Sequence, residues 1–101
     1  MHLTATAIAE AVRRDDIDPV ELVTTTLGRL ADDDLGTVIT LMDSQALSRA
    51  GTAGTGPLAG VPILIKDIFD TAATTTTYGS RLFKRNVPTR TAAAVQRLEA
   101  A

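Results

Sequence analysis

The spacing of apolar residues predicts two helices at the beginning of the chain. Ile8 and Val12 lie four residues apart and favour a helix from about Thr4 to Arg14. A second helix has a defined start, because Asp18 can cap it and Pro19 suits the first helical position. Its apolar residues recur every three or four positions, at Val20, Val23, Leu27 and Leu30. This periodicity predicts one buried face on the second helix.

Two short apolar runs predict strands. The first covers Val38–Leu41. The second, Val61–Asp67 (VPILIKD), is almost continuously apolar, which is typical of a strand covered on both faces in α/β proteins. We therefore expect Ile63 and Ile65 to be buried and Lys66 to lie at or near the end of their strand.

Shorter signals predict the remaining elements. They are a helix over Asp43–Ala50 capped by Asp43 or Ser44, a flexible connector over Gly51–Gly60, a β-prone stretch over Thr71–Ser80 and a last helix from about Thr91 to Ala101. In that last helix, Val95 and Leu98 are expected to face inward. The aromatic residues Phe69, Tyr78 and Phe83 are expected in the core.

Helices that flank a few short strands indicate an α/β fold with an incomplete mixed sheet. Two or three short strands rarely form a stable sheet by themselves, and the predicted last helix runs to the final residue. We therefore expect residues 1–101 to be part of a larger domain. The strand carrying Lys66 would then have an unpaired edge, through which the chain is expected to self-associate.

Composition narrows the range of functions. Of the 101 residues, 45% are hydrophobic and 22% charged, as in ordinary globular proteins, and the net charge is -2. No basic block marks a nucleic-acid surface, and no apolar stretch is long enough to span a bilayer. The absence of cysteine excludes disulfides and thiolate chemistry. We expect a cytoplasmic protein that binds neither nucleic acid directly nor membrane.

No residue pattern in the chain indicates a metal site. Asp32, Asp33 and Asp34 are consecutive and lack both the glycine turn and the later glutamate of a calcium loop, so we interpret them as a solvated loop. His2 is the single histidine and receives no role. No cofactor or metal is therefore expected.

Lys66 is the main candidate for chemistry. It follows the apolar run and precedes Asp67, and its ordinary interpretation is a strand-end lysine that reaches water. A nucleotide site is one alternative, since Gly51–Gly56 is glycine-rich and Ile63–Lys66 is similar to a kinase strand. The order does not fit, because a phosphate-binding loop should precede a helix and these glycines precede the predicted strand.

A family resemblance is the other alternative. Gly56–Asp67 (GPLAGVPILIKD) resembles the first motif of the amidase signature family, and Thr76–Ser80 (TTYGS) is similar to its T-x-x-G-S stretch. Further matches occur at Asp18–Val23, at Asn86–Pro88 and in the helix beginning near Thr91. The resemblance thus covers essentially the whole chain. The clear departure is Ala73, where a glycine is common.

The resemblance implies an amidase that cleaves linear carbon–nitrogen amide bonds with a Ser–cisSer–Lys triad. Lys66 matches the lysine, which acts as the base, while a cis-serine relays the proton and a second serine attacks the amide carbonyl. Both serines belong to a Gly/Ser-rich motif that would follow Ala101, so residues 1–101 would be the N-terminal portion of one amidase signature domain, truncated before that motif. No stand-in is evident among Ser44, Ser48 and Ser80. The isolated chain is therefore expected to be inactive.

The resemblance leaves the activity of the full-length protein open. One possibility is an amidase for small-molecule amides. A second is the glutaminase-type subunit of a tRNA-dependent amidotransferase, which would require partner subunits. A third, from a different class, is a non-catalytic degenerate homologue.

The chemistry requires more than a lysine. A lysine in water has a pKa of about 10.4, so roughly one molecule in a thousand is neutral near pH 7.4, and freeing the base costs about 4 kcal/mol. Burial in a desolvated pocket reduces that cost, and the walls of such a pocket are expected to come from the rest of the domain. Asp67 is not expected to pair with Lys66, because neighbours on a strand point to opposite faces.

Overall fold

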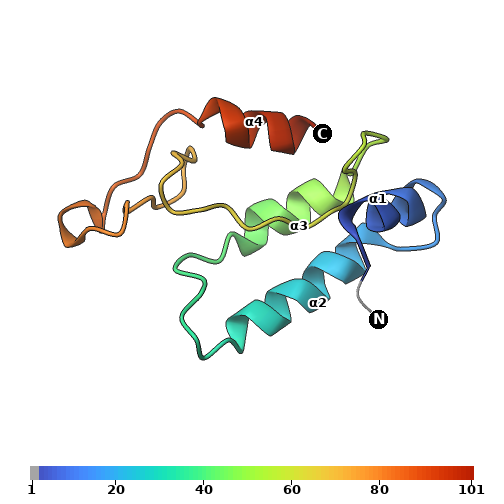
Figure 1. Ribbon diagram of the computed structural model, residues 1–101, viewed down its shortest axis with the longest axis horizontal. Coiled ribbons are helices and arrows are strands. Elements are labelled where there is room, and N and C mark those ends of the chain that lie inside the picture. The colour runs from blue at the N-terminus through green and yellow to red at the C-terminus, as the bar shows by residue number, and fades with distance from the viewer. Residues whose placement is uncertain (1–2) are drawn as a thin grey trace. The chain divides into compact units, whose positions relative to one another are not determined.

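The computed structural model describes residues 3–101 as helices joined by irregular segments (Figure 1). The elements are α1 (Ala5–Arg13), α2 (Pro19–Ala31), α3 (Asp43–Gly51), the short 3-10 turn η1 (Arg81–Phe83) and α4 (Ala93–Ala100). The chain divides into two compact units. The N-terminal unit extends to Pro62 and includes Ala101, and the C-terminal unit covers Ile63–Ala100.

The two opening helices are confirmed, and local signals explain where they begin. The Thr4 hydroxyl accepts a hydrogen bond from the Ala7 amide at 3.1 Å, which caps α1. The Asp18 carboxylate accepts one from the Val20 amide at 2.8 Å, and Pro19 occupies the first turn of α2. Both caps satisfy amides that have no partner within the helix.

Small residues form most of the core of the N-terminal unit. The buried apolar residues there are Ala9, Val23, Ala50 and Ala59. Helices α2 and α3 pack side by side (Figure 1). Gly60 has a left-handed backbone with φ 73°, and a Cβ at this position would lie 2.9 Å from the Val12 side chain and 3.0 Å from Pro19. Only glycine fits there, which ties the motif around Gly60 to the first two helices.

The third helix is confirmed, but its predicted cap is wrong. The residue at the N-cap is Met42, and no side chain caps the helix. Asp43 is already the first helical residue, and its carboxylate accepts a hydrogen bond from the neighbouring Ser44 amide at 3.0 Å. The cap position requires a non-helical backbone, so a helix that begins one residue earlier leaves both predicted residues inside it.

The predicted α/β fold with a mixed sheet is wrong, since no strand occurs among residues 3–101. Val38–Leu41 and Val61–Lys66 have no regular secondary structure, and neither forms a ladder with another segment. An apolar run favours burial, but a strand exists only where a second segment supplies hydrogen-bond partners. Without a sheet, the edge through which self-association was expected does not exist, and self-association itself stays a prediction.

The predicted burial of Ile63 and Ile65 is not found. Ile63 is 42% exposed, and Ile65 is half-buried. Leu64 between them is 68% exposed. A continuous apolar run is covered on both faces only when other elements pack on both sides, and the described residues provide no such layers.

The C-terminal unit is held by irregular pairing between residues 70–78 and 86–92. The Thr76 amide donates to the Asn86 carbonyl at 2.9 Å, and the Asn86 side-chain amide donates back to the Thr76 carbonyl at 2.9 Å. Further along, the Ala73 amide donates to the Pro88 carbonyl at 3.1 Å. Side chains provide part of this pairing, as in the 3.0 Å bond from the Ala72 amide to the Thr91 hydroxyl. The segments therefore run antiparallel without a regular backbone ladder.

Threonines are the buried polar residues of this unit. Thr71, Thr74 and Thr76 are between 2% and 9% exposed. Each hydroxyl donates to a backbone carbonyl two residues earlier, at distances from 3.2 to 3.5 Å. These local bonds offer the backbone an alternative to a sheet ladder, which explains why a β-prone stretch is not a strand.

The last helix is confirmed in part. It begins at Ala93 and ends at Ala100, and Val95 is 2% exposed as expected. Leu98 was expected to face inward and is 46% exposed. The aromatic residues expected in the core are also partly exposed: Phe69 39%, Tyr78 39% and Phe83 42%. Periodicity predicted this helix, but among the described residues it buries Val95 and leaves Leu98 partly exposed.

Replacing Ala73 with glycine should stabilise the chain by about 1 kcal/mol. Ala73 has a left-handed backbone with φ 60°, at the position where the family resemblance leads one to expect glycine. A side chain makes this conformation costly, and glycine adopts it freely. Urea unfolding would measure the difference, with Ala72→Gly as the matched control. That control should destabilise the chain, and a lower midpoint for Ala73→Gly would contradict the interpretation.

Two further properties concern membranes and metals. No helix in the described part of the chain is both long and apolar enough to cross a bilayer. Across residues 3–101, no group of three or more His, Cys, Asp and Glu side chains is arranged to hold a metal ion. His2 lies outside the described residues.

Candidate functional site

Lys66 stands at the end of the irregular apolar segment, where the chain enters a turn. Its carbonyl accepts a hydrogen bond from the Phe69 amide at 3.1 Å, which fixes the backbone just after the lysine. The side chain is exposed. Within residues 3–101 it forms no hydrogen bond or ion pair. The amino group is therefore presented from a fixed turn without a partner.

The neighbouring Asp67 closes the loop that follows Lys66. Its carboxylate accepts a hydrogen bond from the Thr77 amide at 2.7 Å. The Thr77 hydroxyl donates to the second carboxylate oxygen. One side chain thus joins two points ten residues apart, and we call this pair the Asp67–Thr77 clamp. It fixes the backbone on the C-terminal side of Lys66.

The clamp favours the ionised form of Asp67. The hydrogen bond from the Thr77 hydroxyl lowers the pKa of this carboxyl below its ordinary value, and the bond from the Thr77 amide lowers it further. The positive charge of Lys66 contributes in the same direction, but it is the smallest of the named causes. Asp67 forms no direct pair with Lys66, as expected. The reason is its binding to Thr77, and not the alternation of side chains along a strand.

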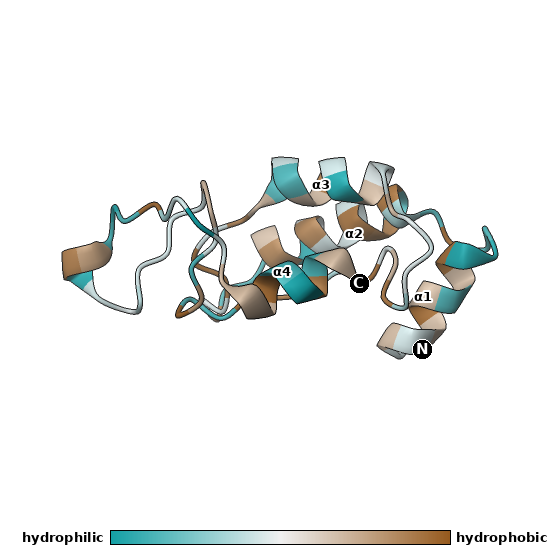
Figure 2. Cartoon of the chain, turned by 90° about the horizontal axis from the view of Figure 1, so that it is seen from above, coloured by the Kyte–Doolittle hydropathy of each residue, from teal (hydrophilic) through white to brown (hydrophobic). Residues whose placement is uncertain are grey.

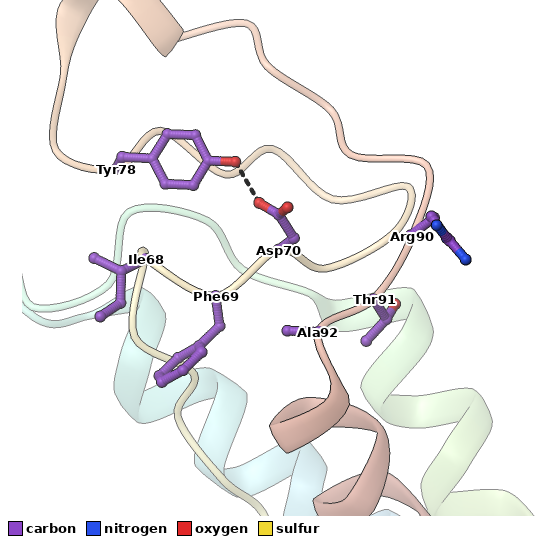
Figure 3. A pocket seen from close by; sticks show the side chains of 7 residues that line it. All are labelled: Ile68, Phe69, Asp70, Tyr78, Arg90, Thr91 and Ala92. Atoms are coloured by element: carbon purple, nitrogen blue, oxygen red, sulfur yellow. Dashed lines mark hydrogen bonds between the residues drawn. The ribbon is translucent and has the colours of Figure 1, made fainter.

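A cavity of about 300 Å³ lies in the same unit (Figure 3). Its lining residues are Ile68, Phe69, Asp70, Tyr78, Arg90, Thr91 and Ala92. The volume is at the lower limit for small-molecule sites. Lys66 is not among the lining residues, so the cavity and the candidate lysine are distinct features.

Tyr78 lines this cavity and is held there by contacts of its hydroxyl and of its ring. Its hydroxyl donates to the Asp70 carboxylate (Figure 3), and this bond raises the pKa of Tyr78 above its ordinary value. Its ring meets that of Phe83 edge to face, with centroids 5.2 Å apart. Tyr78 also has a left-handed backbone with φ 54°, which is unusual for a bulky residue. These contacts hold a conformation that the isolated residue would not favour.

The serines and the glycine-rich stretch that were considered in the sequence lie on other parts of the chain. Ser80 accepts a hydrogen bond from the Leu82 amide at 3.2 Å, which makes it the cap of η1. Ser44 and Ser48 lie on α3. The glycine-rich stretch Gly51–Gly60 leads into an irregular segment and not into a helix, which is unfavourable for a phosphate site.

Sequence reasoning missed the partnership between Asp67 and Thr77. Both residues lie inside stretches that resemble the family motifs, yet no periodicity connects them. Their separation of ten residues follows neither the helical nor the strand repeat. The available signal was a pair of short polar residues on either side of a stretch rich in threonine. Such a signal does not specify which side chains form hydrogen bonds with each other.

Comparisons with known proteins identify the family. A sequence profile of the family described as Amidase matches residues 21–101. The A subunit of the glutamyl-tRNA(Gln) amidotransferase from Nitratidesulfovibrio vulgaris is 35% identical over 107 residues, covering 98% of this chain and 22% of the relative. The proteins of the same name from Chloroflexus aurantiacus and Deinococcus deserti are 36% and 37% identical, covering 99% and 97% of this chain and 23% and 22% of their own lengths.

The alignments extend over nearly all of this chain but over a small part of each relative. The chain spans about a fifth of the length of the curated relatives that it matches. No solved structure matches it. The family profile nevertheless covers well over half of the chain and includes both Lys66 and the Asp67–Thr77 clamp. The chain therefore belongs to the amidase family, whose members carry the amidase signature.

Proposed function

We propose that this chain supplies the catalytic lysine of an enzyme that hydrolyses linear carbon–nitrogen amide bonds. The observation that carries the proposal is the position of Lys66. It lies inside the family-matched region, and its side chain is exposed and unpartnered at a turn fixed by the Asp67–Thr77 clamp. A base must be within reach of the proton that it removes, and a free amino group on a fixed backbone is available for such a contact.

In this proposal Lys66 is the general base of a Ser–cisSer–Lys triad. The neutral amine takes a proton from the cis-serine, which takes one from the nucleophilic serine as that serine attacks the amide carbonyl. We assign both serines to sequence outside these 101 residues. A lysine in water is almost fully protonated at neutral pH, so the enclosing walls that favour the neutral amine are assigned to the same additional sequence.

A second candidate is the glutaminase-type subunit of a glutamyl-tRNA(Gln) amidotransferase. The observation that favours it is the set of relatives named as the A subunit of that enzyme, which align with 97–99% of the chain. The reaction at Lys66 would again be amide hydrolysis, with glutamine as the amide and with partner subunits required. A non-catalytic homologue is the third candidate, and activity measurements separate it from the first two.

The 101-residue chain alone should neither hydrolyse amides nor react with a serine-selective phosphonofluoridate. The reason is that no serine motif accompanies Lys66. A chimera in which residues 1–101 replace the matching segment of the Nitratidesulfovibrio vulgaris relative, produced with that enzyme's partner subunits, should gain both properties. Ammonia release from glutamine and from simple amides would measure turnover and separate the two enzymatic candidates from the non-catalytic one.

Two results would contradict these expectations. Turnover by the isolated chain that Lys66→Ala abolishes would show that the chain holds its own nucleophile. A chimera that assembles with its partner subunits, but neither reacts with the phosphonofluoridate nor releases ammonia, would favour the non-catalytic homologue. The reading frame that follows Ala101 provides an independent check, since a Gly/Ser-rich motif there would support an enzyme.

A further inference from the structure

The two units of the chain carry opposite net charges. The N-terminal unit contains nine acidic and four basic residues, and the C-terminal unit contains six basic and three acidic residues. No acidic residue occurs between Asp70 and Glu99. This separation is hidden in the overall net charge of -2. Charge asymmetry of this kind points to a charged partner.

The positive charge is concentrated around η1, in a segment that we call the basic turn (Ser80–Asn86). Arg81, Lys84 and Arg85 are all exposed, and none forms an ion pair within the described residues. Leu82 lies among them and is 85% exposed. Figure 2 shows hydrophobic and hydrophilic residues adjacent on this turn.

The basic turn is held in one conformation. The Ser80 hydroxyl accepts a hydrogen bond from the Leu82 amide at 3.2 Å, and the Asn86 amide donates to the Phe83 carbonyl at 2.9 Å. The Phe83 ring meets Tyr78 edge to face. An apolar side chain exposed on a rigid turn loses little conformational freedom when it binds.

The N-terminal unit carries an opposite feature, which we call the acidic loop (Asp32–Thr37). Asp32 and Asp34 are exposed. Asp33 accepts hydrogen bonds from the Thr37 amide at 2.9 Å and from its hydroxyl at 2.6 Å, which closes the loop. Leu35 at the loop is 81% exposed. The acidic loop is thus also fixed, and it also presents a leucine beside charges.

We propose that the basic turn of one copy of this chain binds the acidic loop of a second copy. Leu82 and Leu35 are the two most exposed large apolar residues in the described chain. Each lies among charges opposite to those around the other. Pairing them would remove both leucines from water while opposite charges meet around them.

A second copy of the chain accounts for both the basic turn and the acidic loop, whereas other anionic partners account for the basic turn alone. A nucleic acid or an anionic membrane would account for the basic turn, but it would leave Leu35 exposed within an acidic loop.

An interface made of only these two segments would bury much less than the roughly 1,000 Å² of a stable interface. We therefore expect weak, salt-sensitive association. A dimer formed by one such contact keeps one free turn and one free loop, so the contact can propagate into larger oligomers.

Charge reversal on the 101-residue chain tests this pairing. One variant reverses the basic turn (Arg81→Glu, Lys84→Glu, Arg85→Glu). The other reverses the acidic loop (Asp32→Lys, Asp34→Lys) and keeps Asp33, which closes that loop. Sedimentation across a concentration series up to about 1 mM should show the average mass of the unmodified chain rising with concentration and falling at high salt. Each variant alone should stay monomeric.

The mixture of the two variants provides the sharpest outcome. The acidic loop of the first variant can then pair with the basic turn of the second, and the two reversed segments also carry opposite charges, so an equimolar mixture should recover the association that neither variant shows alone. Leu82→Ser leaves all charges in place and should weaken association about tenfold. Circular dichroism would confirm that each variant keeps its helices, and the recovery of association in the mixture would show that the pairing segments remain formed.

Several results would overturn the proposal. One is an average mass of the unmodified chain that is independent of concentration. Another is self-association that neither reversal reduces. Binding of the unmodified chain to phosphatidylserine vesicles or to a single-stranded oligonucleotide, lost on reversing the basic turn while the mass stays monomeric, would identify a membrane or a nucleic acid as the partner instead.

Discussion

Amide hydrolysis by the chimera should fall by about 10²–10⁴-fold when Lys66 is replaced with alanine. This range is the usual contribution of a positioned general base. The loss should appear in kcat, because the proposed role concerns proton transfer and not substrate binding. Ammonia release under saturating substrate would measure it, alongside the rate of phosphonofluoridate labelling, which depends on the same activated serine.

Two further variants separate a base from a simple positive charge. Lys66→Arg keeps the charge, but a guanidinium does not lose its proton in proteins, so its activity should fall about as far as that of Lys66→Ala. Lys84→Ala removes an exposed lysine of the same unit and should leave turnover unchanged. Full activity in Lys66→Arg would assign Lys66 an electrostatic role and contradict its role as base.

Replacing Asp67 with alanine should lower the free energy of unfolding by about 1–3 kcal/mol. The Asp67 carboxylate accepts both the amide and the hydroxyl of Thr77, in a partly buried position. Its removal leaves the Thr77 amide without that partner and releases the loop that follows Lys66. Urea unfolding would measure the change, and Asp34→Ala, an exposed aspartate, should remain within about 0.5 kcal/mol of the unmodified chain.

The stability that the Asp67–Thr77 clamp contributes should depend on pH in a defined direction. The hydrogen bonds from Thr77 lower the pKa of Asp67 in the folded chain, so folding favours the ionised carboxylate. The resulting stability is fully present above the ordinary aspartate pKa of about 3.9 and is lost as the pH falls through the lowered value. Asp67→Asn should remove this part of the pH dependence, and so should Thr77→Val in part.

One specific result would contradict a stabilising role of the Asp67–Thr77 clamp. Equal unfolding midpoints for Asp67→Ala and Asp34→Ala would show that the contacts to Thr77 contribute no net stability.

Because Asp67 adjoins Lys66 without pairing with it, we regard Asp67 as a positioning residue. In the chimera, Asp67→Asn should therefore reduce kcat less than Lys66→Ala does, and it should leave the phosphonofluoridate-reactive serine detectable.

The helices could be predicted because their signals are local. Asp18 and Pro19 specify the start of α2 through bonds made within one turn, and Thr4 does the same for α1. Helical hydrogen bonds join residues four apart, so a short window of sequence contains both partners. The position of Lys66 in a family motif is likewise a property of the linear sequence.

Sequence alone determined where the first two helices begin and that Lys66 is the candidate residue, whereas tertiary structure decided what surrounds it. The run Val61–Lys66 reads as a buried strand, yet it pairs with no described segment and leaves Ile63 exposed. The Asp67–Thr77 clamp and the left-handed backbone of Ala73 also became visible only in three dimensions. Strand pairing, burial and loop closure each require residues distant in sequence to meet, and no local pattern of apolar and polar positions specifies which ones do.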